Sequence, residues 1–209
     1  MRKENKMDQS LSRLALAATL VAALAVPSPA ATATWQIDPA HTAAGFSVRH
    51  MMIATVRGQF KGVTGTVLWD DQDINNSTVD VTIDANTVDT GESKRDADLK
   101  SANFFDVKNY PTITFKSTKI EKISAGKMKV TGNLTIHGVT KQVVLDVEGP
   151  SGAVKDPWGN TRVALNATTT VNRTDYGVKW NAKMDSGGMV VGDDVNINID
   201  LEMTKKEAK

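Results

Sequence analysis

Three histidines, His41, His50 and His137, are the side chains of this sequence best suited to acid–base or metal chemistry. A zinc site needs three or four ligands that converge on the ion. The histidines are dispersed along the chain without a His-x-x-x-His spacing, and there is no cysteine. The sequence therefore predicts no metal site. It leaves His50, at the end of an expected strand, as either a polar cap over a cavity or a structural histidine.

Asp71-x-Asp73-x-Asn75 resembles the opening of a calcium-binding loop. Such a loop needs Gly at its sixth position and a bidentate Glu at its twelfth, but this chain has Asn76 and Thr82 there. We expect a polar turn instead. Ser, His and Asp all occur, yet the sequence has no Gly-x-Ser-x-Gly nucleophile elbow, so nothing in it supports an enzyme.

Two arginine–aspartate combinations, Arg95-Asp96 and Arg173-x-Asp175, could act on a charged group. They could bind the head group of a ligand, or they could pair with one another and fix a helix at the end of the fold. Because buried charges are costly unless they are paired, the structural ion pair is the preferred interpretation.

Strands must position these residues, because apolar and polar residues alternate through most of the chain from Val79 onward. Period-two alternation predicts strands with one buried and one wet face, which is typical of antiparallel sheets. Turn sequences at Ala125-Gly126, His137-Gly138, Gly149-Pro150 and Gly159-Asn160 separate several of them. The expected strands cover residues 45–50, 56–69, 79–86, 112–120, 128–136, 143–147, 163–171 and 195–202.

Eight antiparallel strands close most naturally into a barrel. Residues 92–106 depart from the alternation and place Glu92, Asp96 and Lys100 at i, i+4 spacing, which predicts a short helix over one mouth of the barrel. The length of 209 residues, with no linker and no repeat, indicates one domain. The expected fold class is all-β, an eight-stranded antiparallel barrel with one short helix.

The inward faces of these strands carry few large side chains. Aromatic residues are 5% of the chain, and small side chains inside an eight-stranded barrel leave space for one ligand. A dry void lowers stability, whereas a bound apolar chain gains about 0.8 kcal/mol per buried CH₂. Two alternatives stay open: the sheet flattens into a packed sandwich, or the apolar faces turn outward to lipid as in outer-membrane barrels, whose aromatic girdles are not evident here.

The first 33 residues have the organisation of a secretory signal peptide. Basic residues precede an apolar run from Leu14 to Val26, which is short for a membrane-spanning helix, and small residues follow up to Ala33. Cleavage near Ala33 predicts a periplasmic or secreted protein with its binding domain at 34–209. Removing four of the 25 basic and two of the 24 acidic residues leaves a net charge of −1, which argues against nucleic acid or an anionic membrane surface as the main partner.

Eight motifs occur in order along the chain expected to remain after cleavage. They are Trp35-x-Ile37-Asp38-x-x-His41, Phe46-x-Val48-x-His50, Gly58-x-Phe60, Arg95-Asp96-x-x-Leu99-Lys100-Ser101-x-x-Phe104-Phe105-Asp106, Tyr110-Pro111-x-Ile113-x-Phe115, Gly132-x-Leu134-Thr135-x-x-Gly138, Asp156-Pro157-Trp158-Gly159 and Arg173-x-Asp175-Tyr176-Gly177. Together they resemble the YceI-like, polyisoprenoid-binding family of bacterial secreted proteins. The resemblance implies a lipocalin-like barrel with a short helical crossover that holds an isoprenoid, quinone-like or related amphiphilic lipid. Members of that family often carry His where this chain has Asp98, so no polar contact is carried over to that position.

The strand faces and the resemblance together predict a secreted binding protein that sequesters or transports such a lipid. It would require no cofactor, bind no nucleic acid and insert no segment permanently in a membrane; a homodimer is compatible with the sequence. A packed barrel that binds a protein partner through an edge strand or the loop at 70–77 is the alternative, and an enzyme acting on such lipids would depend on His50 or Asp96. The predicted ligand-binding residues are Phe46, Val48, His50, Phe60, Val81, Ile83, Leu99, Phe104, Phe105, Phe115, Leu134, Leu165 and Ile197.

Overall fold

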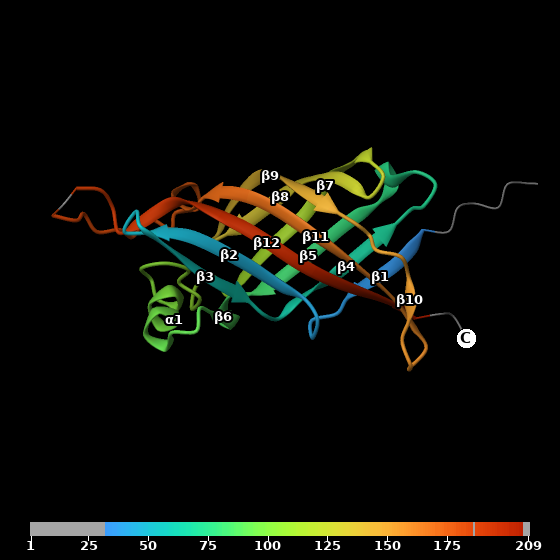
Figure 1. Ribbon diagram of the computed structural model, residues 1–209, viewed down its shortest axis with the longest axis horizontal. Coiled ribbons are helices and arrows are strands. Elements are labelled where there is room, and N and C mark those ends of the chain that lie inside the picture. Colours follow the sequence, from blue (N-terminus) through green and yellow to red (C-terminus); the bar gives the residue numbers. More distant parts are fainter. Residues whose placement is uncertain (1–31, 186, 207–209) are drawn as a thin grey trace, which may run out of the picture.

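The computed structural model describes residues 32–185 and 187–206, so most of the expected signal peptide lies outside the described residues. Within these residues, one antiparallel sheet curls into an elongated barrel with one α-helix, α1 (Ser93–Lys100), at one end (Figure 1). Among the described residues, no helix is both long enough and apolar enough to cross a membrane. The strands are β1 (Ala33–Ile37), β2 (Ala43–His50), β3 (Ala54–Phe60), β4 (Val63–Trp69), β5 (Thr78–Asp84), β6 (Val88–Asp89), β7 (Thr112–Ser124), β8 (Lys127–Ile136), β9 (Val139–Glu148), β10 (Val154–Lys155), β11 (Asn160–Asn172) and β12 (Val191–Lys206).

Eight strand positions close the barrel, as the sequence predicts. β1 and β2 follow one another along β12 and share one position. β3 and β4 likewise share the next position, and β5 and β6 the third, while β7, β8, β9, β11 and β12 fill one position each. Pairing of β11 with β12 along the whole of β11 completes the ring. The eight-stranded antiparallel barrel is therefore confirmed.

The structure differs from the expected strands in two places. The single strand expected over 56–69 is broken after Phe60, because Gly62 turns the chain with a left-handed φ of +66°. The strand β1 was not among those expected from the alternation, because its five residues are too few to show a clear period.

The helix expected over 92–106 is shorter than the sequence suggests, and its second half was predicted wrongly. The Glu92 carboxylate caps its first turn by accepting from the N–H groups of Lys94 and Arg95 at 3.1 and 2.7 Å. The helix ends at Lys100 because the Ser101 hydroxyl and N–H both donate to the Asp98 carbonyl. Residues 101–110 then form successive turns.

The apolar faces of the strands point into the ring, where their side chains form one core cluster. The alternative with apolar faces turned outward is therefore wrong. At the end of the barrel where β1 meets β12, Ile37, Val163 and Met203 are buried and fill the interior. Toward α1 the inward residues no longer meet across the middle, and the barrel is hollow.

A charged cluster ties the filled end together around Arg162 of β11. Its guanidinium donates to Asp38 at 2.7 Å, to Asp156 at 2.8 Å and to Glu202. Asp38 begins the turn that separates β1 from β2, and Glu202 belongs to β12, so the cluster joins three neighbouring positions of the ring. Hydrogen bonds from Arg162 and then from His41 lower the pKa of Asp38 to about 2.

Acid should therefore weaken the native protein between about pH 4 and pH 2. The depressed pKa of Asp38 contributes stability that is complete above its unfolded value of 3.8 and is lost as the pH falls through about 2. In an Arg162→Met variant the carboxylates lose their cation, so we expect a lower urea midpoint at pH 6 and a much flatter pH dependence below pH 4.

Urea denaturation at pH 2–6 measures both effects. Lys129→Met is the matched control, because it removes an exposed pair with Asp146 on the barrel wall and should change the midpoint little. A wild-type pH slope retained in Arg162→Met would show that the cluster does not contribute.

Candidate functional site

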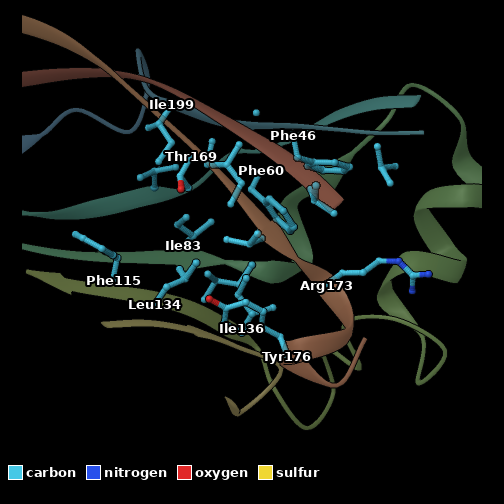
Figure 2. Close-up of a pocket in the computed structure, with 18 of the residues that line it drawn as sticks. Phe46, Phe60, Ile83, Phe115, Leu134, Ile136, Thr169, Arg173, Tyr176 and Ile199 are labelled. Atoms are coloured by element: carbon cyan, nitrogen blue, oxygen red, sulfur yellow. The ribbon is translucent and has the colours of Figure 1, made fainter. Parts of the chain in front are cut away.

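The hollow half of the barrel contains a cavity of about 510 Å³. Most of its wall is built from Val, Ile, Leu, Ala and Phe side chains, chiefly those of the inward strand faces. Figure 2 shows Phe46, Phe60, Ile83, Phe115 and Leu134 among the residues that surround this space. The expected alternative of a flattened, fully packed sandwich is therefore wrong.

All thirteen residues that the sequence assigns to ligand binding line this cavity. They are Phe46, Val48, His50, Phe60, Val81, Ile83, Leu99, Phe104, Phe105, Phe115, Leu134, Leu165 and Ile197. Their contact with a ligand stays a prediction. The positions of the strand residues among them follow from the alternation, which fixes the face of each strand residue, whereas Leu99, Phe104 and Phe105 were assigned from the family resemblance and lie in α1 and the turns after it.

Two glycines keep the aromatic rings from filling the cavity. A Cβ built on Gly58 would stand 2.5 Å from Cζ of Phe46, and one on Gly132 would stand 2.4 Å from Cζ of Phe115. Each ring thus occupies the space of an absent side chain on the neighbouring strand. The rings lie close to the wall, and the centre of the barrel stays open.

The segment around α1 covers one side of the cavity. Phe105 packs edge-on against Phe60 with ring centroids 5.3 Å apart, and Phe104 lies 5.3 Å from Trp180. Leu99 of the helix also lines the cavity. No residue of α1 is itself buried, so the helix rests on this end of the barrel chiefly through the apolar residues at and after its last turn.

The cavity opens at this end, where its lining reaches exposed charged residues. Arg49, Glu92 and Lys94 are exposed and line it together with His50, which is half-buried at the end of β2. His50 therefore lies at the mouth, as its expected role as a polar cap over the cavity requires. Asp98 also lines the mouth, and its carboxylate accepts from the side-chain amide of Asn103 at 2.8 Å.

Arg173 was expected to pair with an aspartate or a head group, but it is buried and bonded mostly to backbone. Its guanidinium donates to the carbonyls of Val178, Trp180 and Gly192 at 2.7, 2.9 and 2.8 Å, with a weaker contact to Val191. Its carboxylate partner is Asp193 at 3.2 Å. Burial lowers the pKa of Arg173 from its ordinary value. Arg173 thus fixes the segment that follows it against the start of β12.

The other arginine–aspartate combination, Arg95-Asp96, also has a structural role. Arg95 donates to the hydroxyl and carbonyl of Thr90 at 2.8 and 3.1 Å, and Asp96 accepts from the Thr90 N–H at 2.8 Å. Arg95 and Asp96 therefore hold the start of α1 to the chain that leaves β6. The expected pairing between these residues and Arg173 or Asp175 is wrong, because Arg95 and Asp96 bond to Thr90 and Arg173 bonds to Asp193.

In two other clusters of acidic residues, the carboxylates already accept hydrogen bonds from groups of the protein. Asp38, His41 and Glu202 converge closely enough to hold an ion, but the Arg162 guanidinium donates to both carboxylates. In the turn that resembles a calcium loop, Asp70 is buried and accepts from the N–H groups of Gln72 and Asp73, each at 2.9 Å.

Residues 35–203 match the family model described as the YceI-like domain. A UPF0312 protein of Vibrio parahaemolyticus is 36% identical over 161 residues, which cover 76% of this chain and 85% of that relative. The crystal structure of a Campylobacter jejuni YCEI protein is 33% identical, with a TM-score of 0.63, over 76% of this chain and 90% of that chain.

A polyisoprenoid binding domain from Saccharophagus degradans has the same fold. It superposes with a TM-score of 0.58 over 82% of this chain and 98% of that chain. The two are 15% identical, so the likeness concerns the architecture alone. The same barrel is thus compatible with very different sequences.

A bulky residue at position 83 should enter empty space. We expect Ile83→Trp to leave the thermal midpoint of the unliganded protein within a few degrees of wild type, because its indole can occupy the cavity. Val163→Trp is the matched control, since Val163 is inward-facing and buried but does not line the cavity. Overpacking there should destabilise by about 1–3 kcal/mol, and equal losses in the two variants would contradict a hollow barrel.

Proposed function

This chain belongs to the YceI-like family, and on that premise we propose that it is a secreted binding protein that holds a linear isoprenoid or quinone-like lipid in its barrel. The single observation that carries the proposal is the apolar cavity of about 510 Å³, open at one end. The description of the Saccharophagus degradans domain as polyisoprenoid binding supports the same class of ligand. Secretion is supported by the signal-like pattern of residues 1–33.

The size of the cavity favours an extended hydrocarbon. Apolar cavities of about 150 Å³ stay dry and accept a ligand the size of benzene, and this cavity is more than three times larger. Sites for small molecules span about 300–1,000 Å³. An elongated barrel of this volume therefore suits several five-carbon units in a row, with the polar end of the ligand at the mouth.

The energetics of an empty cavity also favour a bound chain. In engineered cores a void lowers stability by about 24 cal/mol per Å³. At that rate, the free-energy cost of leaving a cavity of this size empty is comparable to the whole net stability of a domain, which is about 5–15 kcal/mol. A methyl-rich ligand recovers part of it, at about 0.8 kcal/mol per buried CH₂.

The groups around the cavity favour binding over catalysis. The charged residues best placed for chemistry, Arg95, Asp96 and Arg173, are engaged in hydrogen bonds that hold the mouth together. The loop at 70–77, the candidate surface for a protein partner, uses its carboxylates within its own turn. The cavity is the more specific feature, and it favours a lipid carrier over a protein-binding module.

A saturating prenol should stabilise the protein. At about 100 times its dissociation constant a ligand adds about 2.7 kcal/mol, which corresponds to a rise of about 5–10 °C in thermal midpoint for a chain of this size. We expect this rise with geranylgeraniol, a smaller one with geraniol and none with glycerol. Differential scanning fluorimetry measures the series.

Ile83→Trp is the control for site-specific binding. Its indole should compete for the cavity and reduce the rise with geranylgeraniol, whereas Ile123→Ser, at the far end of the barrel, should retain it. Native mass spectrometry of protein purified from its own host provides an independent test. Identical masses before and after delipidation, together with no thermal shift, would contradict the proposal.

A further inference from the structure

Five apolar side chains form a surface at the mouth that we call the apolar rim: Met51, Met52, Ile53, Met184 and Met189. Met52 and Ile53 are 64% and 80% exposed, and Met51 and Met189 are also exposed. Large apolar residues scattered over a surface are ordinary, but a group of them beside a cavity marks an interaction site.

The apolar rim comes from two turns that lie side by side. The turn between β2 and β3 carries Met51, Met52 and Ile53, and its Met51 N–H donates to the Val190 carbonyl at 2.7 Å. The second turn, formed by residues 182–185 and 187–190, precedes β12, and Lys183 pairs antiparallel with Met189 in it. A Cβ placed on Gly188 would stand 3.4 Å from Cε of Met184 and 3.6 Å from Cγ of Met52, so the two groups of methionines are contiguous.

These turns project at the open end of the barrel, next to the cavity mouth. In Figure 1 the end of β2 and the segment before β12 extend together beyond the strands at the end that carries α1. The residues that flank the apolar rim, Arg49, His50 and Val190, line the cavity. A surface that contacts the apolar rim would therefore face the mouth.

The backbone of the β2–β3 turn is not the one that methionine favours. Met51 and Met52 have φ values of +50° and +64°, in the left-handed region that suits Asn and Gly. The Arg49 guanidinium braces this turn by donating to the Met52 carbonyl at 2.9 Å and to the Thr55 hydroxyl at 3.1 Å. The turn thus combines exposed apolar side chains with an unfavourable backbone, a combination that stability alone does not explain.

The chain next to the apolar rim carries charges of both signs, with Lys179 and Lys183 before and within the second turn and Asp193 and Asp194 at the start of β12. Lys179 and Lys183 are exposed, and neither forms an ion pair with a carboxylate in the part of the chain that the structure describes. Asp185 is the one acidic residue of the segment from 178 to 190. The near-zero charge of the whole chain does not oppose local attraction, because only charges within about a Debye length of a surface act on it.

We propose that the apolar rim docks reversibly on a phospholipid bilayer that contains anionic head groups, so that the barrel mouth faces the membrane. Exposed Met and Ile side chains enter the interface between head groups and acyl chains, and the lysines contact phosphates. A protein partner is a poorer fit, because a specific interface uses about 20–30 residues a side and the apolar rim has five on two narrow turns. The proposal rests on the proposed function only for the purpose of docking, which is transfer of the lipid ligand.

Flotation with vesicles tests the docking directly. Wild-type protein should float with vesicles of phosphatidylethanolamine and phosphatidylglycerol, and Ile53→Ser should weaken this binding about tenfold, the loss expected when one large apolar side chain no longer enters the interface. Ile123→Ser is the matched control, because Ile123 is also exposed, at 58%, beside the β7–β8 turn at the opposite end. No flotation of the wild type, or equal losses in the two variants, would overturn the proposal.

Two further variants test the contributions of the lysines and the methionines to vesicle binding. Lys179→Gln together with Lys183→Gln should weaken binding by about fivefold per lysine at low salt and leave the weak binding to phosphatidylcholine unchanged. Met51→Asn together with Met52→Gly should fold at least as stably as wild type, because these residues suit the left-handed turn, and should still lose flotation. Retained flotation in that stable variant would count against the apolar rim.

Failure of docking can be distinguished from failure of the proposed function. The thermal shift with geranylgeraniol, measured without vesicles, should be the same in Ile53→Ser and wild type, because Ile53 does not line the cavity. A thermal shift without flotation would overturn docking alone, and flotation without a thermal shift would overturn lipid binding alone. If Ile53→Ser instead abolished a concentration-dependent self-association seen by analytical ultracentrifugation and left flotation intact, the apolar rim would be a contact between two copies of the chain.

Discussion

The closed ring of eight strands is the constraint on which the rest of the structure depends. Strand number and stagger fix the width of a barrel, so the interior cannot contract when its side chains are small. In this chain the residues that line the cavity are mostly Val, Ile, Leu and Ala, and two of the rings, those of Phe46 and Phe115, lie over glycines of neighbouring strands. The cavity is therefore a geometric result of closure combined with side-chain volume.

Closure also explains why the two ends of the barrel differ. At one end β1 and β12 share only a short ladder, and the cluster around Arg162 joins the strands where backbone pairing is weakest. At the other end β6 pairs with β3 and not with β7, so the wall is incomplete there. The segment with α1 and its following turns covers that gap. One end of the barrel is thus filled, and the other is partly covered by α1 and its following turns, where the cavity opens.

The sequence predicted the barrel and the strand residues of the cavity lining well because both follow from period-two alternation, which is local information, whereas Leu99, Phe104 and Phe105 were found through the family motifs. The features that the sequence did not predict involve hydrogen-bond partners that are distant along the chain or that belong to the backbone. Arg162 meets Asp38 across 124 residues, and Arg173 is held by backbone carbonyls, which no residue pattern reveals. The end of α1 depended on the bonds of Ser101. Gly62, inside the strand expected over 56–69, is a local signal of the break between β3 and β4 that the prediction did not use.

Selectivity in such a barrel must come from length and from the mouth, not from the wall. Methyl-lined surfaces distinguish one apolar chain from another by only about 1–3 kcal/mol per methylene. Most of the charged groups that could bind a ligand head group already form hydrogen bonds within the protein, since Arg95 is bonded to Thr90 and Arg173 to carbonyls. A carrier with a permissive interior therefore gains most of its specificity from where it collects its ligand. The position of its mouth relative to the source of the lipid then matters more than any single contact inside.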